Sequence, residues 1–138
     1  MKIEQLDAGT DRKIVSCSVA TTVAQAARLL AEKRIGALPV MDGGRIVGIF
    51  SERDLLYSVA EKGATVLDAC VDTVMTSPAI TITADTSVDD AMALMTRRRI
   101  RHLPVCDGDQ LLGFVSIGDL VKSRMDEIAG EAQAMRDY

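Results

Sequence analysis

Hydrophobic and polar positions in the first half of the chain change from a strand-like to a helix-like spacing. The run 14–17 is rich in β-branched residues and predicts a short strand. After this run, Thr22 and Gln25 have the spacing of a capping box, which predicts a helix that starts directly after Thr22. Apolar residues then follow at intervals of three and four, as on one face of a helix. These residues are Val23, Ala26, Ala27 and Leu30.

A hairpin is predicted next. The apolar runs 37–41 and 46–50 are separated by a short polar segment that contains Asp42 and Gly43. Asp-Gly between two apolar runs is the strongest short-range signal for a tight hairpin turn. A second helix is expected to begin at Ser51, since serine is a preferred residue for the position before a helix.

The same order returns 65 residues later without a gap. Between positions 21 and 55, fifteen of 35 residues are identical to the residue 65 further on. The second copy has a β-branched run at 80–83, a helical face of Val88, Ala91, Met92 and Met95, strands at 102–106 and 111–115 around Asp107-Gly108, and a helix from Ser116. We therefore predict an α/β (α+β) fold of two β-α-β-β-α repeats. Each repeat of about 60 residues is near the limit for folding alone, so the two are expected to pack with pseudo-two-fold symmetry.

The repeat divides the chain into five expected parts. They are an N-terminal segment (1–12), a first repeat (13–62), a linker and entry to the second repeat (63–76), a second repeat (77–124) and a C-terminal helical tail (125–138). The tail has apolar residues at helical spacing, with Gly130 as a weak point inside it. We expect a homodimer, because a partner would cover the exposed apolar helix faces.

Charge and composition narrow the possible functions. The 138 residues include 16 basic and 20 acidic side chains, for a net charge of −4 and a pI near 4.9, and only 3% are aromatic. Nucleic-acid binding is disfavoured, because it needs basic groups for the phosphates and aromatic rings for unpaired bases. The sequence contains no run of 18 apolar residues, so no membrane-spanning helix is predicted. The first residues lack the apolar core of a signal peptide. A cytoplasmic protein is expected.

The cysteines do not suggest chemistry. Cys17, Cys70 and Cys106 form no Cys-x-x-Cys pair, and His102 is the only histidine. We interpret the three as reduced and mostly buried small hydrophobic residues. A metal site is not expected, because one histidine cannot complete a typical set of ligands.

At this point the residues resemble a known family. Each copy contains Leu-Pro-Val, then Asp-Gly, then Gly-x-x-Ser-x-x-Asp-Leu, and the run that begins at Val74 resembles the usual entry into a second copy. This doubled motif is similar to a tandem pair of CBS domains, a Bateman module, over roughly 13–125. The resemblance implies clefts between the two repeats that bind adenosine-containing ligands, and free-standing pairs of this kind commonly dimerise.

The Gly-x-x-Ser-x-x-Asp motif carries the main candidate chemistry. In the family it contacts ribose and phosphate. A serine that opens a helix lies beside free backbone N–H groups at the positive end of the helix dipole, which favours phosphate. An aspartate one turn later can accept from two ribose hydroxyls. The same spacing is also an ordinary helix cap, and this alternative stays open for Ser51 with Asp54 and for Ser116 with Asp119.

A basic cluster precedes the second Leu-Pro-Val. By resemblance, Arg101 and His102 would reach the phosphates of a bound nucleotide, and an arginine fork suits phosphate oxygens. Arg97 and Arg98 are interpreted as a solvated helix end. The first copy has Gly36 and Ala37 at the positions of Arg101 and His102, so it should bind phosphate more weakly. Arg53 could supply part of the missing positive charge.

The remaining predicted contacts would surround adenine in an apolar slot. By resemblance, the strand exits and the Leu-Pro pairs form its walls. The first site then comprises Ser16, Ser18, Val19, Gly36, Ala37, Leu38, Pro39, Ser51, Arg53 and Asp54. The second comprises Thr81, Thr83, Ala84, Arg101, His102, Leu103, Pro104, Ser116, Gly118 and Asp119.

Four functions remain to be compared. The favoured one is a regulatory module that binds an adenosyl ligand such as AMP, ATP or NAD(H) and signals to a partner protein. A structural interaction module with a vestigial pocket is the main alternative. An enzyme is disfavoured, because no nucleophile–base pair or metal cluster is recognisable. A nucleic-acid binder is disfavoured by the net charge.

Overall fold

The computed structural model describes residues 1–6 and 13–137, so part of the expected N-terminal segment, 7–12, lies outside the described residues. Contacts between residues divide the chain into two compact units. The first unit is Ile14–Ile80 and holds the first repeat. The second unit joins Met1–Lys13 to Thr81–Tyr138 and holds the second repeat. The predicted mixed α/β fold is confirmed in both.

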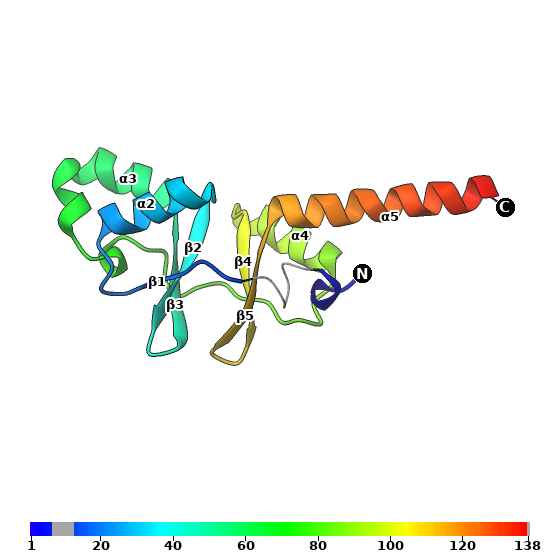
Figure 1. The fold of residues 1–138 in the computed structure, drawn as a ribbon, viewed down its shortest axis with the longest axis horizontal. Coiled ribbons are helices and arrows are strands. Elements are labelled where there is room, and N and C mark those ends of the chain that lie inside the picture. The colour runs from blue at the N-terminus through cyan, green and yellow to red at the C-terminus, as the bar shows by residue number, and fades with distance from the viewer. Residues whose placement is uncertain (7–12, 138) are drawn as a thin grey trace. The chain divides into compact units, whose positions relative to one another are not determined.

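The first unit is a small three-stranded sheet with helices (Figure 1). Strand β1 runs parallel to β2, and β2 runs antiparallel to β3, in the order β1-β2-β3. The elements are β1 (Cys17–Ser18), α2 (Val23–Lys33), β2 (Ala37–Asp42), β3 (Arg45–Ser51), α3 (Glu52–Lys62) and the 3₁₀ helices η2 (Ala64–Asp68) and η3 (Val71–Thr73).

The second unit repeats the helix, hairpin and helix. Strands β4 and β5 form an antiparallel pair. The elements are η1 (Ile3–Gln5), α4 (Val88–Arg98), β4 (His102–Asp107), β5 (Gln110–Ser116) and α5 (Ile117–Asp137). Of the predicted strand 80–83, only one bridge remains, between Ile82 and Val105. The strand ends there because the Thr83 N–H donates to the Thr86 hydroxyl (3.2 Å) and the chain turns.

The hairpin turns lie one residue later than predicted. Asp42 is still the last residue of β2, and the turn itself is Gly43-Gly44, with φ of +58° and +85°. Two successive residues with positive φ match the twist of a two-residue hairpin, and glycine adopts them without a steric cost. In the second unit Gly108 has a φ of +60° at the same point.

The C-terminal tail is not a separate helix. Helix α5 continues through Gly130 to Asp137, so the expected boundary between 124 and 125 falls inside one helix. Its apolar residues recur at intervals of three and four, but several are exposed instead of buried. The exposed ones are Val121, Met125, Ile128 and Met135.

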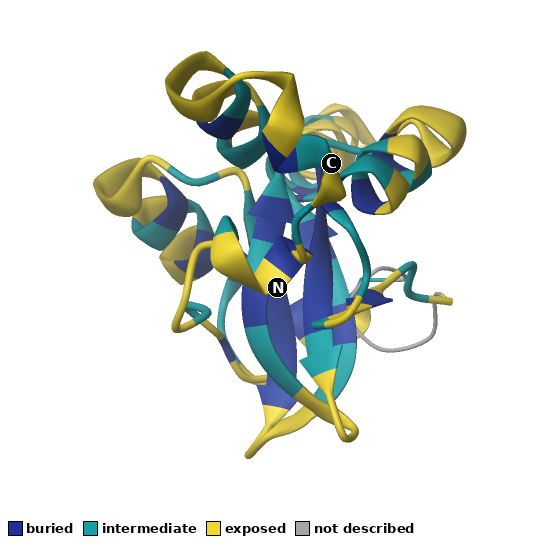
Figure 2. Ribbon diagram, turned by 90° about the vertical axis from the view of Figure 1, so that its left-hand side faces the viewer, coloured by how far each residue is buried: buried dark blue, intermediate teal, exposed yellow. Residues whose placement is uncertain are grey.

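Each unit has its own apolar core beneath the helices. Figure 2 shows buried strands between exposed turns and outer helix faces. The core of the first unit centres on Leu38, Val40 and Phe50, together with Val23 and Ala26 of α2. Fully buried residues of the second unit include Leu103, Val105, Ala91, Val115 and Leu120. The helical faces predicted from the sequence are correct except that Ala27 and Met92 are only half-buried.

Residues 63–76, expected as a linker, complete the first unit. Val71 is fully buried, and its N–H donates to the Thr21 carbonyl at 2.7 Å. In the second unit Ile3 takes the same place, with its N–H on the Thr86 carbonyl at 2.9 Å. The 3₁₀ turn that precedes the second repeat therefore packs on the first repeat, and the 3₁₀ turn that precedes the first repeat packs on the second.

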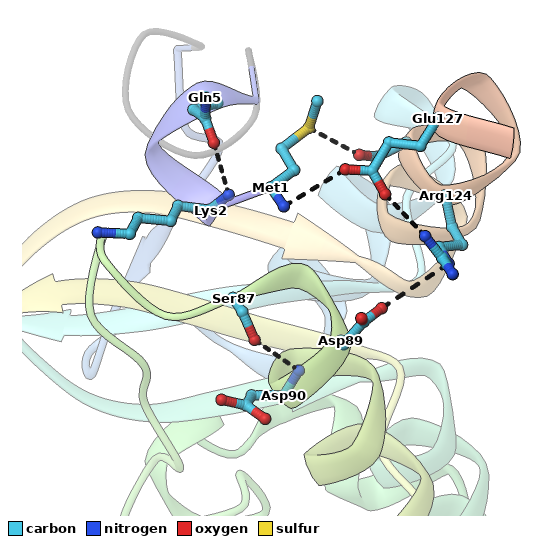
Figure 3. A network of polar contacts seen from close by, with 9 residues as sticks. Met1, Lys2, Gln5, Ser87, Asp89, Asp90, Arg124 and Glu127 are labelled. Atoms are coloured by element: carbon cyan, nitrogen blue, oxygen red, sulfur yellow. Dashed lines mark hydrogen bonds and ion pairs between the residues drawn. The ribbon is translucent and has the colours of Figure 1, made fainter. Parts of the chain in front are cut away.

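A polar network fastens the N-terminal turn of the second unit to α5 (Figure 3). The Met1 ammonium lies 3.3 Å from Glu127 Oε1, and Arg124 Nη1 lies 3.0 Å from Glu127 Oε2. The hydrogen bond from Arg124 and then that from the Met1 ammonium hold the pKa of Glu127 below its usual value. Arg124 Nε also lies 3.9 Å from Asp89 near the start of α4, so three segments meet in one network.

Candidate functional site

Ser51 and Asp54 form a reciprocal cap at the start of α3. The Asp54 N–H donates to Ser51 Oγ at 3.2 Å, and the Ser51 N–H donates to Asp54 Oδ2 at 2.9 Å. The Ser51 hydroxyl also donates to Oδ2, at 3.0 Å. Two of the backbone N–H groups that a helix start would leave unpaired are thereby satisfied.

Ser116 and Asp119 form the same cap at the start of α5. The Asp119 N–H donates to Ser116 Oγ at 3.2 Å, and the Ser116 N–H donates to Asp119 Oδ2 at 2.8 Å. The capping role left open by the sequence is therefore present in both repeats. Capping holds each aspartate carboxylate in a fixed position. A carboxylate has more acceptor sites than the cap uses, so the same group can also accept hydrogen bonds from a ligand.

The strand entries lie beside these caps, as the sequence predicts. Ala37 pairs with Ser51 across the hairpin, and Gly36 accepts from the Glu52 N–H at 3.0 Å. In the second repeat His102 pairs with Ser116. Arg101 accepts from the Ile117 N–H there, at 2.8 Å. The basic positions and the helix N-terminus are thus neighbours in the second repeat, whereas small residues take their place in the first.

The Leu-Pro pairs follow directly along β2 and β4. Leu38 and Leu103 are fully buried, and Pro39 and Pro104 are buried beside them. They therefore contribute to the core, as the sequence also indicated for the leucines. Arg53 and Gly118 are exposed on the first turns of α3 and α5, between the serine and the aspartate of each cap.

The only histidine has an additional packing role. The ring of His102 stacks on that of Phe114, with centroids 5.6 Å apart and the planes inclined by 15°. This contact holds the ring against the sheet. The adjacent Arg101 is exposed, so its guanidinium is the more available group for an anion.

The predicted strand-exit residues lie away from the caps. β1 is parallel to β2 with Ser18 beside Met41, while Ala37 at the other end of β2 is beside Ser51. Four residues of strand separate these ends by about 13 Å. Val19 is also at the far end, since its N–H donates to Met41. Ser16 is exposed and precedes β1, on the side that runs back toward Ala37.

The second repeat shows the same separation. Thr83 follows Ile82, which pairs with Val105, and its hydroxyl donates to Asp85 within the turn. The Ala84 carbonyl accepts from the Glu4 N–H at 2.8 Å. Thr81 is exposed and precedes the bridge. The structure therefore brings Arg101, His102, Ser116 and Asp119 together, whereas Thr83 and Ala84 lie in the turn that follows Ile82, away from this cap.

One contact at the first cap was not predicted from the sequence. The Thr76 hydroxyl donates to Asp54 Oδ1 at 2.9 Å, across 22 positions of sequence. Thr76 reaches this point because its backbone pairs with Ile49 of β3 through two hydrogen bonds of 2.9 and 2.8 Å. The threonine lies in a segment interpreted as a linker, so the repeat pattern alone gave no reason to place it at the site.

Gly48 explains how that segment approaches the strand. A Cβ at this position would lie 2.5 Å from Met75 Sδ and 2.9 Å from the Thr76 carbonyl oxygen. The absence of a side chain at Gly48, the glycine of the Gly-x-x-Ser-x-x-Asp motif, thus leaves room for the chain's own residues 75 and 76. A glycine inside a strand is a known signal for such a close backbone approach.

The cysteines lie outside this site chemistry. Cys17 and Cys106 are buried and Cys70 is exposed, so two of the three are core residues as predicted. Burial raises the pKa of the Cys17 thiol to about 11, and burial followed by the charge of Asp109 raises that of Cys106. Within residues 1–6 and 13–137, no group of three or more histidine, cysteine or acidic side chains could hold a metal ion.

Known proteins with this arrangement identify the family. The sequence model of the CBS domain matches residues 4–61 and 71–126, most of the chain in two copies. The chain belongs to the CBS domain family. The mitochondrial CBS domain-containing protein CBSX3 of Arabidopsis thaliana is 36% identical over 127 residues, covering 88% of the chain and 62% of the plant protein. The chain thus spans less than two thirds of this relative.

Solved CBS structures agree over almost the whole chain. A CBS-domain protein from Burkholderia ambifaria is 42% identical with a TM-score of 0.84, covering 91% of this chain and 95% of that one. ATU1752 from Agrobacterium tumefaciens is 36% identical with a TM-score of 0.84, covering 90% and 99%. These neighbours are stand-alone CBS-domain proteins, so the tandem arrangement predicted from the repeat is confirmed.

Two more distant CBS structures contain ligands. CBSX2 in complex with AMP is 25% identical with a TM-score of 0.78, covering 91% of this chain and 96% of that one. The CBS pair of MJ0100, in complex with 5-methylthioadenosine and S-adenosyl-L-methionine, is 22% identical with a TM-score of 0.80 and shares the fold.

In the part of the chain that the structure describes, no helix is both long and apolar enough to cross a membrane.

Proposed function

We propose that this CBS pair is a regulatory module that binds an adenosyl nucleotide of the AMP, ATP or NAD(H) class and transmits its occupancy to a partner protein. The observation that carries the proposal is the cluster in the second repeat. Arg101 and His102 enter β4 directly beside the helix start that Ser116 and Asp119 cap. A basic side chain, a helix N-terminus and a carboxylate correspond to the phosphate and ribose of a nucleotide.

The two repeats would differ in what they hold. Asp54 and Asp119 each offer a carboxylate to ribose hydroxyls. Only the second repeat has Arg101 at the strand entry, whereas the first has Gly36. A neutral nucleoside would therefore bind either repeat, and a phosphorylated one would prefer the second.

The family supports this class of ligand. CBSX2 binds AMP, and MJ0100, a protein that shares the fold, binds two other adenosyl compounds. Stand-alone CBS-domain proteins are generally regulatory, and we propose that this chain has no catalytic activity of its own. We also propose a cytoplasmic location, consistent with unpaired Cys17, Cys70 and Cys106.

A structural interaction module with a vestigial pocket is the second candidate. One observation favours it: both serine–aspartate pairs already cap helices, which explains their presence without a ligand. The two candidates differ in whether a nucleotide binds the folded chain.

Ligand-linked stability tests the proposed function. A nucleotide at one hundred times its dissociation constant should add about 2.7 kcal/mol to the free energy of unfolding. For a chain of this size, the melting temperature should rise by roughly 6–10 °C. We expect this rise with at least one of AMP, ATP, NAD and NADH at millimolar concentration. The absence of a shift with all four would favour the vestigial pocket.

We expect the protein to be a homodimer. Met125 and Met135 of α5 are 64% and 80% exposed, and Leu56 and Tyr57 of α3 are 65% and 64% exposed. A second copy would bury such apolar area, whose transfer from water is favourable by about 25 cal/mol per Å². Sedimentation velocity at tens of micromolar protein should give about twice the mass of 14.8 kDa. A single species with the monomer mass would contradict the proposal.

A further inference from the structure

Helix α5 is longer than its counterpart in the first repeat. Helix α3 ends at Lys62, and the residue 65 positions after Lys62 is Glu127, so residues 128–137 of α5 have no counterpart. None of the residues 128–137 is buried, and Ala132 alone is half-buried. Figure 1 shows α5 running on past α4. A helical segment of about ten residues is marginal in water by itself, so a further contact is expected to hold it.

The apolar residues of α5 form a second face, separate from the face that packs on the unit. Leu120 and Ser123 are buried and mark the packed face. The other apolar residues follow one another at intervals of four, three, four and three, and all but one are exposed. These residues, which we call the α5 seam, are Val121, Met125, Ile128, Ala132 and Met135. Alternating intervals of three and four residues are the heptad pattern by which two helices pack knobs into holes.

We propose that the α5 seam binds the α5 seam of a second copy of the chain, as an antiparallel two-stranded coiled coil. When Met125 lies opposite Ile128 of the second copy, Val121 lies opposite Ala132. A larger side chain then meets a smaller one in the outer layer, which fills the space between the helices evenly. A parallel pair would instead place Ala132 opposite Ala132 and leave a gap in that layer.

The antiparallel direction also supports the end of each helix. It places residues 128–137 of one copy along the first half of α5 in the other copy, which packs on its own unit. Arg124 and Glu131 flank the seam, and this alignment brings Arg124 of each copy beside Glu131 of the other. Opposite charges beside a seam favour one partner and one orientation. Arg124 can keep its contact with Glu127, because a guanidinium has five N–H donors.

The coiled coil would form the surface of the homodimer proposed above, and it requires no bound nucleotide. Ile128→Glu tests how much the seam contributes to dimerisation. The dissociation constant should rise about 100-fold or more, since two isoleucine side chains lose a burial worth about tenfold each. Gln133→Glu is the matched control, because it adds the same charge to an exposed position outside the seam and should dissociate like the wild type.

Sedimentation velocity over a dilution series measures both dissociation constants, and circular dichroism verifies that the variants are folded. An Ile128→Glu dimer as tight as the wild type would overturn the inference and leave the homodimer to another surface. A monomeric wild type at tens of micromolar would overturn both. Neither result bears on the proposed nucleotide binding, which the shift in melting temperature tests separately.

Cysteine cross-linking tests the direction of the pair. The background is Cys70→Ser, because Cys70 is exposed. Val121→Cys and Ala132→Cys are oxidised separately and as an equimolar mixture. In an antiparallel pair, position 121 faces position 132 of the second copy and lies about 17 Å along the helix from the second copy's position 121. A disulfide needs Cα atoms within about 7 Å, so we expect a covalent dimer only in the mixture.

Gln133→Cys in place of Ala132→Cys is the control, since it moves the thiol off the seam by one residue. Its mixture with Val121→Cys should give no covalent dimer. A covalent dimer of either seam variant alone is the result of a parallel pair and would overturn the antiparallel coiled coil. The same conclusion follows if the seam mixture gives no covalent dimer, or if the Gln133→Cys mixture gives as much.

Discussion

Replacing Arg101 with alanine is expected to weaken AMP binding at the second repeat by roughly 10- to 150-fold, because charge-assisted hydrogen bonds are worth about 1.5–3 kcal/mol. Arg101 is exposed at the entry to β4, and its backbone carbonyl is bonded to the first residue of α5. Its side chain therefore starts from a point next to the helix N-terminus. Adenosine has no phosphate, so its affinity at this repeat should change little.

Two further variants make this result specific. Asp119→Ala should weaken AMP and adenosine alike, since both keep the ribose hydroxyls. Arg98→Ala is the matched control, because Arg98 is an exposed arginine in the last turn of α4 and should leave both affinities unchanged. Isothermal titration of the three variants in an Asp54→Asn background isolates the second repeat. An equal loss of adenosine and AMP binding in Arg101→Ala would show that Arg101 supports the shape of the site, and the phosphate assignment would be wrong.

The repeats and hairpins could be predicted because their signals are local. Alternating apolar runs around Asp-Gly define a hairpin within about fifteen residues, and the capping box at Thr22 and Gln25 forms as predicted. The pairing of Ala37 with Ser51 and of His102 with Ser116 follows from the same hairpins. A strand pair fixes which residues meet, so the proximity of the strand entries to the caps was accessible from the sequence.

The rest of the site depended on contacts that the sequence does not encode locally. Strand β1 joins the sheet in parallel, which sends Ser18 toward Met41 and away from Ser51. The 3₁₀ turn at Val71–Thr73 matches the one at Ile3–Gln5 at an offset of 68 positions, not 65, so an ungapped comparison of the repeats does not detect it. Thr76 follows that turn, and its contact with Asp54 is therefore visible only in three dimensions.

Replacing Gly48 with alanine is expected to lower the free energy of unfolding by about 1–3 kcal/mol, the usual cost of adding a methyl group to a closely packed position. The new Cβ would lie 2.9 Å from the Thr76 carbonyl oxygen, which is closer than Cβ atoms in proteins come to other heavy atoms. Met75 Sδ, at 2.5 Å, belongs to a flexible side chain and can move. The carbonyl cannot move without weakening its bond to the Ile49 N–H, because it is part of the pairing that holds residues 75–77 on β3.

Gly130→Ala provides a control of the opposite sign. A Cβ on Gly130 meets nothing within 4 Å, and this glycine lies inside the long helix α5. Alanine is favoured over glycine in a helix interior by about 1 kcal/mol, so this variant should be more stable than the wild type. Urea unfolding of both variants and the wild type measures the two changes. Suppose that Gly48→Ala is as stable as the wild type while Gly130→Ala is more stable. Residues 75–77 would then not pack closely against β3, and the contact between Thr76 and Asp54 would be wrong as well.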